Sequence, residues 1–329
     1  VLGKGCVATS WTMGFLIYHN FQFAHFPEKT QREVFGGRGY TMAPGVIVPS
    51  GVARPVRGGF ELSGEWRWLT GILHADWVLF SSPVIEEGGA AENIGHHGGD
   101  LRRFCVPVEE CEIIDTWDVS AMSSSGSYDM KLDKVFVPEH HQIKVASVAN
   151  RTSPGLEINT GPLWQVPFIT FASLGAVGPM IGGTEGLLEM TTEILKTKVG
   201  AQTGNRQQKL MTQQVRIARL TTSLKAIIKL WEDELNFVWD KVTRGEEITL
   251  EERVEARMIV AHCAKGCDGI ANELVVAAGS RSIYNDSHIQ RFRREINALA
   301  THAFFDYDHL ASLHGSVLLG LELPPNTMV

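Results

Sequence analysis

An apolar stripe in the second half of the chain limits the fold more than any other feature. Between residues 207 and 243, apolar side chains recur every three or four positions on one face of a long helix: Ile217, Leu220, Leu224, Ile227, Trp231, Leu235, Val238 and Val242. The segment Thr249-Leu250-Glu251-Glu252 has the pattern of a capping box and predicts the start of a second helix. Two long helices with a short connection pack antiparallel, so residues 151–329 predict a helical bundle.

The first 38 residues also predict helices. Trp11, Phe15 and Tyr18 recur at helical spacing, and Pro27 stands where a second short helix can begin, because proline is tolerated in the first helical turn. The chain begins with Val rather than Met and shows no signal peptide. We therefore expect these helices to be the remnant of a longer N-terminal helical domain.

Residues 39–150 predict a β domain. Two strands with a turn at Gly58-Gly59 are followed by further strand-like segments, HADWVLFSSPV, RRFCVPV and KLDKVFVPE. The polar, glycine-rich segment from Glu86 to Asp100 predicts a loop, and its pair His96-His97 is interpreted as solvated rather than metal-binding. The predicted α+β chain thus has a helical remnant (1–38), a middle β domain (39–150) and a C-terminal helical bundle (151–329).

Composition excludes several classes of protein. Hydrophobic residues make up 44% and charged residues 20%, as in globular chains, and a net charge of −7 argues against nucleic-acid binding, which needs a basic face. The longest uncharged run, residues 159–184, contains three prolines, so we expect no membrane-spanning helix. Five cysteines, an odd number, favour reduced thiols in a cytoplasmic enzyme over a disulfide framework.

Metal and nucleotide motifs give no competing interpretation. Cys263 and Cys267 lie one helical turn apart beside His262, but no second ligand pair has suitable spacing, so we expect buried helix thiols and no metal. The patterns GxxxxGK[ST], GxSxG and HExxH are absent, and the glycines at 36–39 lack the preceding strand of a dinucleotide fingerprint.

Three segments, in the same order, resemble the acyl-CoA dehydrogenase fold superfamily. Residues 63–77 resemble its "W-I-T-N-G…A-D" segment, and residues 115–140 resemble its second flavin-facing segment with a terminal F-x-V-P strand. Residues 288–303 resemble the C-terminal helix that carries an "R-x-x-R-D" pattern. The residues in register are Trp68, Thr70, Ala75, Asp76, Arg291, Arg294 and Glu295. The resemblance implies N-terminal helices, a middle β-barrel or sandwich and a C-terminal four-helix bundle.

Two departures indicate a particular branch of this superfamily. The stretch ALATHAFFDYD lacks the Glu of a dehydrogenase "Y-E-G-T" segment, and TKVGAQTGNRQQ lacks the "R-x-x-F-G" pattern that helps to hold FAD. The chain instead resembles the two-component flavin-dependent monooxygenases, such as 4-hydroxyphenylacetate, hydroxysteroid-phenol and dibenzothiophene oxygenases. The matching features are His74, the turn Ser124-Ser125-Gly126-Ser127 and His302.

This resemblance implies the oxygenase component of a two-component enzyme. Reduced FMN or FAD would come from a separate NAD(P)H-dependent flavin reductase, sit between the β domain and the bundle, and react with O2 to a C4a-hydroperoxide. That species would hydroxylate a small aromatic substrate such as a phenol, an indole or a polycyclic compound. A homotetramer is implied as well, because this fold completes its flavin sites with neighbouring subunits.

The resemblance also implies roles for individual residues. Ser127 would donate a hydrogen bond near flavin N5, and His74 would contact the substrate and accept a phenol proton. His302 would be oriented by Asp306 on the same helix, with His309 and His314 as rival candidates. The catalytic candidates are His74, Ser127 and His302; those for flavin binding are Trp68, Thr70, Ser125, Gly126, Ser127 and Arg291; those for substrate binding are His74, Trp164 and Phe168, with Phe171 beside them.

Each role has a structural alternative. Ser127 could only stabilise a turn, Thr70 and Trp68 could be ordinary strand residues, and His74 could point outward. Trp164 and Phe168 could belong to the bundle core, and at least one of the arginines at 291, 293 and 294 could lie on a solvated helix face. Two other functions stay open for the whole chain: an acyl-CoA dehydrogenase-like FAD oxidoreductase with a relocated base, and a non-catalytic binding or assembly subunit.

Overall fold

The computed structural model describes residues 1–86, 100–200, 204–324 and 327–329. The pair His96-His97 lies outside these residues. The chain separates into two compact units, each considered by itself. The helical unit contains Val1–Trp11, Val119–Ser124 and Ile169–Val329, and the sheet unit contains Thr12–Asp118 and Ser125–Phe168. The three-domain division at residues 38/39 and 150/151 stays a prediction.

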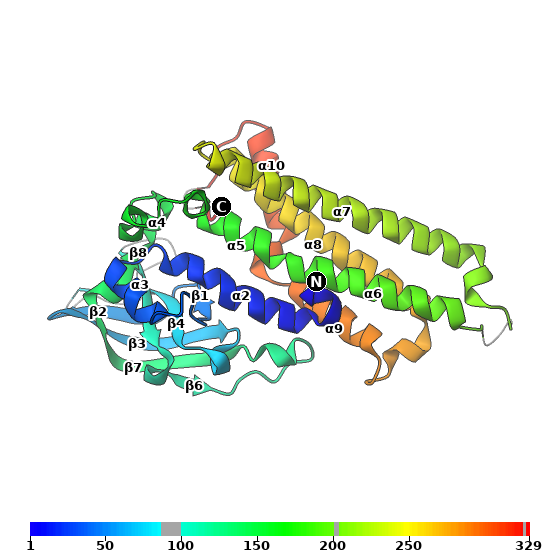
Figure 1. The fold of residues 1–329 in the computed structure, drawn as a ribbon, viewed down its shortest axis with the longest axis horizontal. Helices are drawn as coiled ribbons and strands as arrows, with labels where there is room; N and C mark the ends of the chain where they lie inside the picture. Colours follow the sequence, from blue (N-terminus) through cyan, green and yellow to red (C-terminus); the bar gives the residue numbers. More distant parts are fainter. Residues whose placement is uncertain (87–99, 201–203, 325–326) are drawn as a thin grey trace. The chain divides into compact units, whose positions relative to one another are not determined.

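The sheet unit is built on two four-stranded sheets (Figure 1). One has the order β1-β4-β5-β8, and the other has the order β2-β3-β7-β6. The strands are β1 (Gly45–Val46), β2 (Val52–Val56), β3 (Gly59–Leu69), β4 (Trp77–Pro83), β5 (Leu101–Pro107), β6 (Glu112–Ile114), β7 (Tyr128–Pro138) and β8 (Gln142–Lys144). The hairpin predicted at Gly58-Gly59 is confirmed, since Val56 pairs with Gly59 in the β2–β3 ladder.

A core of large apolar side chains holds this unit together. Trp66, Phe80 and Phe104 are fully buried, and the rings of Trp66 and Phe80 lie 4.6 Å apart between centroids. The Trp66 indole N–H donates to the Ser81 carbonyl at 3.0 Å, so its one polar group is satisfied in the core. The unit also takes in the later part of α2 (Val7–Phe23), the whole of α3 (Glu28–Phe35) and α4 (Val145–Ala149).

The helical unit contains the predicted bundle. Its helices are α1 (Leu2–Gly5), α5 (Phe168–Ala176), α6 (Gly178–Thr197), α7 (Met211–Thr243), α8 (Leu250–Ala278), α9 (His288–Ala300) and α10 (Tyr307–Leu318). α8 packs against α6, α7, α9 and α10, and the long helices run side by side (Figure 1). Most of the predicted α7 stripe is buried: Leu220, Leu224, Ile227, Val238 and Val242.

The capping box predicted at the start of α8 is confirmed. The Thr249 hydroxyl accepts a hydrogen bond from the Glu252 backbone N–H at 3.3 Å, and the Glu252 carboxylate accepts one from the Thr249 N–H at 2.8 Å. On the same helix, Cys263 and Cys267 are fully buried while His262 is exposed, so the three do not face one another. All five cysteines are free thiols.

Close packing explains the glycine-rich start of α6. A Cβ built on Gly186 would lie 2.5 Å from the Lys4 carbonyl oxygen of α1, so only glycine permits this approach. The neighbouring Lys4 ammonium pairs with Glu189 at 2.8 Å.

In the part of the chain that the structure describes, no helix combines the length and the apolar character that crossing a membrane requires.

Candidate functional site

Three hydroxyl groups meet where β3 ends and β7 begins in the sheet unit. Leu69, the last residue of β3, pairs with Tyr128, the first residue of β7, so the adjoining Thr70 and Ser127 lie at one end of the ladder. The Ser127 Oγ lies 3.0 Å from the Thr70 Oγ1 and 2.8 Å from the Ser125 Oγ. The fold therefore brings together four predicted flavin-binding residues from two distant segments, including Gly126. We call Thr70, Ser125 and Ser127 the hydroxyl cluster.

The geometry of the hydroxyl cluster leaves hydrogen-bonding capacity unused. Ser125 and Ser127 are 2% and 3% exposed, and Gly126 between them has φ +51°, a left-handed conformation that favours glycine. The Gly71 N–H donates to the Ser125 carbonyl at 2.9 Å and fixes the turn. Three hydroxyl groups carry three protons, and their two mutual bonds use only two of them. One O–H in the cluster is thus left to donate to another acceptor.

Trp68 does not belong to the core, so the alternative that it is an ordinary strand residue packed in the core is wrong. Its side chain is 65% exposed, whereas Trp66, two positions earlier on β3, is fully buried. The pairing of β3 with β7 shifts register between Trp66 and Leu69, and such an irregularity turns the following side chains away from the alternation of the strand. An exposed indole therefore stands two residues before Thr70.

The hydroxyl cluster and the Trp68 ring are groups that fit a flavin. An isoalloxazine ring presents an apolar face and an edge of carbonyl oxygens and ring nitrogens, which require a stacking surface and uncharged hydrogen-bond donors. Trp68 and the hydroxyl cluster are groups of these two kinds. His74 follows in a 3-10 helix (Ile72–His74) and is exposed, with its own N–H bonded to the Gly71 carbonyl at 2.9 Å.

A second group in the sheet unit contains the predicted substrate residues Trp164 and Phe168. Both rings pack on Phe21 of α2, with centroids 5.6 Å and 6.3 Å away. The Arg103 guanidinium lies 5.9 Å from the Phe168 ring centroid. Sequence reasoning assigned neither Phe21 nor Arg103 to a site. Phe21 continues the helical spacing of Trp11, Phe15 and Tyr18, which was the available signal. The other predicted aromatic, Phe171, lies on α5 in the helical unit.

His302 lies among aromatic rings in the helical unit. Its ring centroid is 5.2 Å from Trp11, 5.1 Å from Phe304 and 5.9 Å from Phe305. Burial, followed by the nearby charge of Arg257, lowers the pKa of His302 to about 4. The ring is therefore neutral at pH 7. Its Nδ1 accepts the Phe304 N–H at 3.2 Å, so the proton resides on Nε2, which is a donor.

The predicted helical pairing of His302 with Asp306 is wrong. α9 ends at Ala300, and a 3-10 turn (Ala303–Phe305) separates it from α10. Asp306 instead caps α10, where its carboxylate accepts the His309 N–H at 3.2 Å. The chain therefore bends between the two residues and they share no helix face.

The three arginines of α9 diverge. Arg293 donates to the Asn272 side chain at 2.8 Å, and Arg294 donates to the Ser120 carbonyl and the Gln290 side chain; both are exposed. Arg291 is half-buried, and its Nε has no hydrogen-bond partner among the described residues. Arg291 is thus the half-buried member of the set with an unused donor, and its role in flavin binding stays a prediction.

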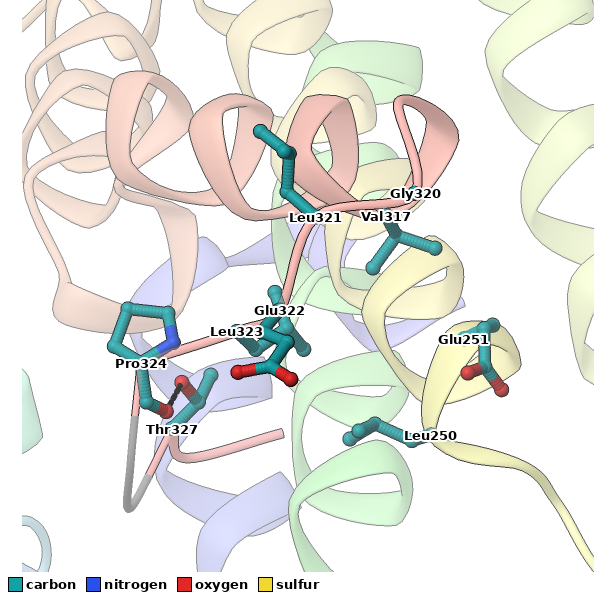
Figure 2. Close-up of a pocket in the computed structure, with 9 residues that line it drawn as sticks. All are labelled: Leu250, Glu251, Val317, Gly320, Leu321, Glu322, Leu323, Pro324 and Thr327. Carbon is teal, nitrogen blue, oxygen red and sulfur yellow. Dashed lines mark hydrogen bonds between the residues drawn. The ribbon is translucent and has the colours of Figure 1, made fainter.

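A hollow of about 650 Å³ lies beside the C-terminal end of α10 (Figure 2). Its lining combines apolar side chains with two carboxylates: Leu250, Glu251, Val317, Gly320, Leu321, Glu322, Leu323, Pro324 and Thr327. None of these is a predicted site residue. The proposals on function therefore rest on the residue groups described above, each within its own unit, and not on this hollow.

Comparison with known proteins identifies the family. Residues 174–307 match the family described as "Acyl-CoA dehydrogenase, C-terminal domain". The chain is 30% identical over 320 residues to a pigment production hydroxylase of Rhodococcus sp. (strain ATCC 21145), covering 97% of this chain and 80% of that protein. It is 27% identical over 329 residues to "Flavin-dependent monooxygenase, oxygenase subunit HsaA" of Rhodococcus jostii (strain RHA1), covering 100% and 84%.

Another relative and a solved structure indicate the same family. The oxygenase component of p-hydroxyphenylacetate 3-hydroxylase from Acinetobacter baumannii is 28% identical over 333 residues, covering 100% of this chain and 76% of that protein. The crystal structure of 3-HSA hydroxylase from Rhodococcus sp. RHA1 superposes with a TM-score of 0.89 at 25% identity, covering 98% and 81%. The chain belongs to the flavin-dependent monooxygenase oxygenase components with the acyl-CoA dehydrogenase fold, and its cofactor is a flavin.

Proposed function

We propose that this protein hydroxylates a small aromatic substrate with reduced flavin delivered by a separate reductase. The observation that carries the proposal is the hydroxyl cluster beside the exposed Trp68, because it offers uncharged donors and an aromatic surface together. The name of the p-hydroxyphenylacetate relative supports a phenolic substrate, and the term "oxygenase component" supports a partner reductase. We further propose that the protein works as a homotetramer.

In this proposal, residues of the sheet unit hold the flavin. Trp68 stacks on the ring, Ser127 donates the unused hydroxyl proton to it, and Thr70, Ser125 and Gly126 fix Ser127 in place. Considered by itself, the helical unit offers Arg291 as a further candidate for flavin binding. When bound and reduced, the flavin activates O2 for transfer of one oxygen atom to the substrate. The protein contributes orientation, hydrogen bonds and exclusion of water.

Each unit offers one histidine for the reaction, and we propose a different task for each. Since the pKa of His302 is lowered to about 4, its neutral ring is a poor base at pH 7 and serves as a hydrogen-bond donor through Nε2. We assign acceptance of the phenol proton to His74, which makes the aromatic ring more nucleophilic. Trp164 and Phe168 supply apolar contact with the substrate.

The proposal is tested with chemically reduced FMN or FAD, supplied without any reductase. The protein, the reduced flavin and 18O2 are mixed with a panel of phenols and indoles, and products are analysed by mass spectrometry while hydrogen peroxide is measured in parallel. We expect a product that carries one 18O atom. Peroxide as the sole product across the panel, or anaerobic bleaching of bound oxidised FAD by acyl-CoA, would contradict the proposal.

A further inference from the structure

Arg257 is a buried charge with unused hydrogen-bond donors in the part of the chain that the structure describes. It lies on α8, is 3% exposed, and its Nε and Nη1 have no hydrogen-bond partner in the described residues. None of the ion pairs found among those residues includes it. Its Cζ lies 5.1 Å from the Phe304 ring centroid. Burial lowers the pKa of Arg257 to about 10, so the guanidinium stays charged at neutral pH.

Arg103, the other deeply buried arginine, has the hydrogen-bond partners that are expected of a structural residue. Arg103 is 6% exposed and also lacks a carboxylate among the described residues. Its guanidinium nevertheless donates to the Gln22 side chain at 2.6 Å, to the Val46 carbonyl at 2.6 Å and to the Ser81 hydroxyl at 2.9 Å. Burying a charge without hydrogen-bond acceptors is strongly unfavourable. The Arg257 guanidinium contacts the Phe304 ring, but its Nε and Nη1 bond no described residue, which indicates that an acceptor arrives with a ligand.

The surroundings of Arg257 define what kind of acceptor fits. The Phe304 ring centroid lies 5.1 Å from the Arg257 Cζ and 5.1 Å from the His302 ring centroid, so both groups border the same ring. In agreement with this geometry, the charge of Arg257 lowers the pKa of His302. The His302 ring is in turn surrounded by the rings of Trp11, Phe304 and Phe305. A hydrated inorganic anion gains little from such rings, whereas an aromatic body that carries an oxyanion can contact the rings and the guanidinium together.

We propose that Arg257 binds a carboxylate group of the aromatic substrate. The planar guanidinium presents its N–H donors in a fork that matches two carboxylate oxygens, a geometry that lysine does not offer. This inference rests on the proposed function, in which His302 contacts the substrate. It narrows the substrate class to aromatic acids. A flavin phosphate is the other source of an oxyanion, and the experiment separates the two.

Isothermal titration calorimetry without flavin provides the test. The probes are 4-hydroxybenzoate and 4-hydroxybenzamide, which differ in charge but share the ring and the hydroxyl group, and inorganic phosphate. We expect the carboxylate to bind at least tenfold more tightly than the amide and than phosphate. Arg257→Met should abolish this preference. Arg219→Met, which removes an exposed charge that pairs with Glu273 on the neighbouring helix, should leave the preference intact.

Several results would overturn the inference. They are equal affinities for the two aromatic probes, no binding of 4-hydroxybenzoate, tighter binding of phosphate, or a preference that survives in Arg257→Met. That variant should melt no lower than the parent protein, because it removes an uncompensated buried charge. If it fails to fold, Arg257→Lys replaces it and should weaken carboxylate binding about tenfold; unchanged binding counts against the inference.

This test is independent of the test of the proposed function. Binding is measured without flavin or O2, so loss of the carboxylate preference alongside normal hydroxylation would reject only the role of Arg257. A clear preference without any oxygenated product would reject only the oxygenase proposal.

Discussion

At the scale of single residues, Ser127 occupies the middle of the hydroxyl cluster. It contacts both Thr70 and Ser125, so its hydroxyl orientation is set by two neighbours rather than by water. A donor fixed in advance costs little reorganisation when a ligand arrives, which is how preorganised polar groups assist a reaction. Ser125 is the natural comparison, because it shares one of these bonds and holds an end of the cluster.

We expect Ser127→Ala to divert reducing equivalents from hydroxylated product to hydrogen peroxide. The variant should also bind oxidised FMN or FAD at least several-fold more weakly, because a charge-neutral hydrogen bond contributes about 1 kcal/mol. Product-to-peroxide ratios and quenching of flavin fluorescence measure the two effects. Ser125→Ala removes one of the two neighbours that fix Ser127 but leaves the Ser127 hydroxyl in place, so it should give smaller changes in both quantities. Equal defects in the two variants would show that Ser127 acts only through the integrity of the turn.

At the scale of elements, the ends of two helices are secured in different ways. α8 is capped locally by Thr249 and Glu252. The start of α2 is capped from a distance, because the buried Glu295 carboxylate of α9 accepts backbone N–H groups of Val7 and Ala8. A carboxylate at a helix N-terminus satisfies free N–H groups and interacts favourably with the helix dipole. The cap of α8 can be predicted from the spacing of Thr249 and Glu252 in the sequence. The cap of α2 cannot, because only the folded chain brings Glu295 to Val7 and Ala8.

We expect Thr249→Ala to lower the free energy of unfolding by about 1 kcal/mol, the usual cost of losing a helix cap. Chemical denaturation followed by circular dichroism measures the change. Thr222→Ala serves as the control, since the Thr222 hydroxyl only bonds back to the Ala218 carbonyl within α7. That control should be neutral or slightly stabilising, because alanine has the higher helix propensity. A loss of the same size in both variants would argue against the cap.

At the scale of the whole molecule, buried titratable groups link stability to pH. Burial lowers the pKa of His19, His25 and His302 to about 4. The unfolded chain therefore binds more protons at these sites between pH 6.5 and 4, which favours unfolding as pH falls. Glu234 on α7 acts in the opposite direction, because burial and the charges of Glu255 and Glu252 raise its pKa to about 7.

We expect the melting temperature to fall steadily from pH 6.5 to 4.5. The three histidines with a pKa of about 4 favour the unfolded state, and Glu234 favours the folded state. The lowered pKa of His141 and the raised pKa of Glu295 act in opposite directions and offset each other. The net uptake on unfolding is about two protons, or about 3 kcal/mol per pH unit. Calorimetry across this range measures the slope. Glu234→Gln should raise stability at pH 8 by about 2 kcal/mol and steepen the acid slope. A flat profile between pH 6.5 and 4.5 would contradict the buried, neutral state of the histidines.

Local patterns in the sequence accounted for much of the fold and for part of the site. The apolar stripe of α7, the Thr249 capping box and the hairpin at Gly58-Gly59 depend on neighbours in the chain, so periodicity and turn residues predicted them. Resemblance also singled out Thr70 and Ser127, which lie 57 positions apart and meet in the hydroxyl cluster. Their roles in flavin binding stay predictions.

By itself, the sequence determined the helical and β zones, because hydrophobic periodicity is a local property that burial enforces along each element. Only the tertiary structure decided that Trp68 is exposed, that the chain turns between His302 and Asp306, and that two N–H donors of the buried Arg257 bond no described residue. These features depend on strand register, on where a helix ends and on which distant side chains surround a charge. Long-range packing sets all three, and no short pattern of residues encodes them.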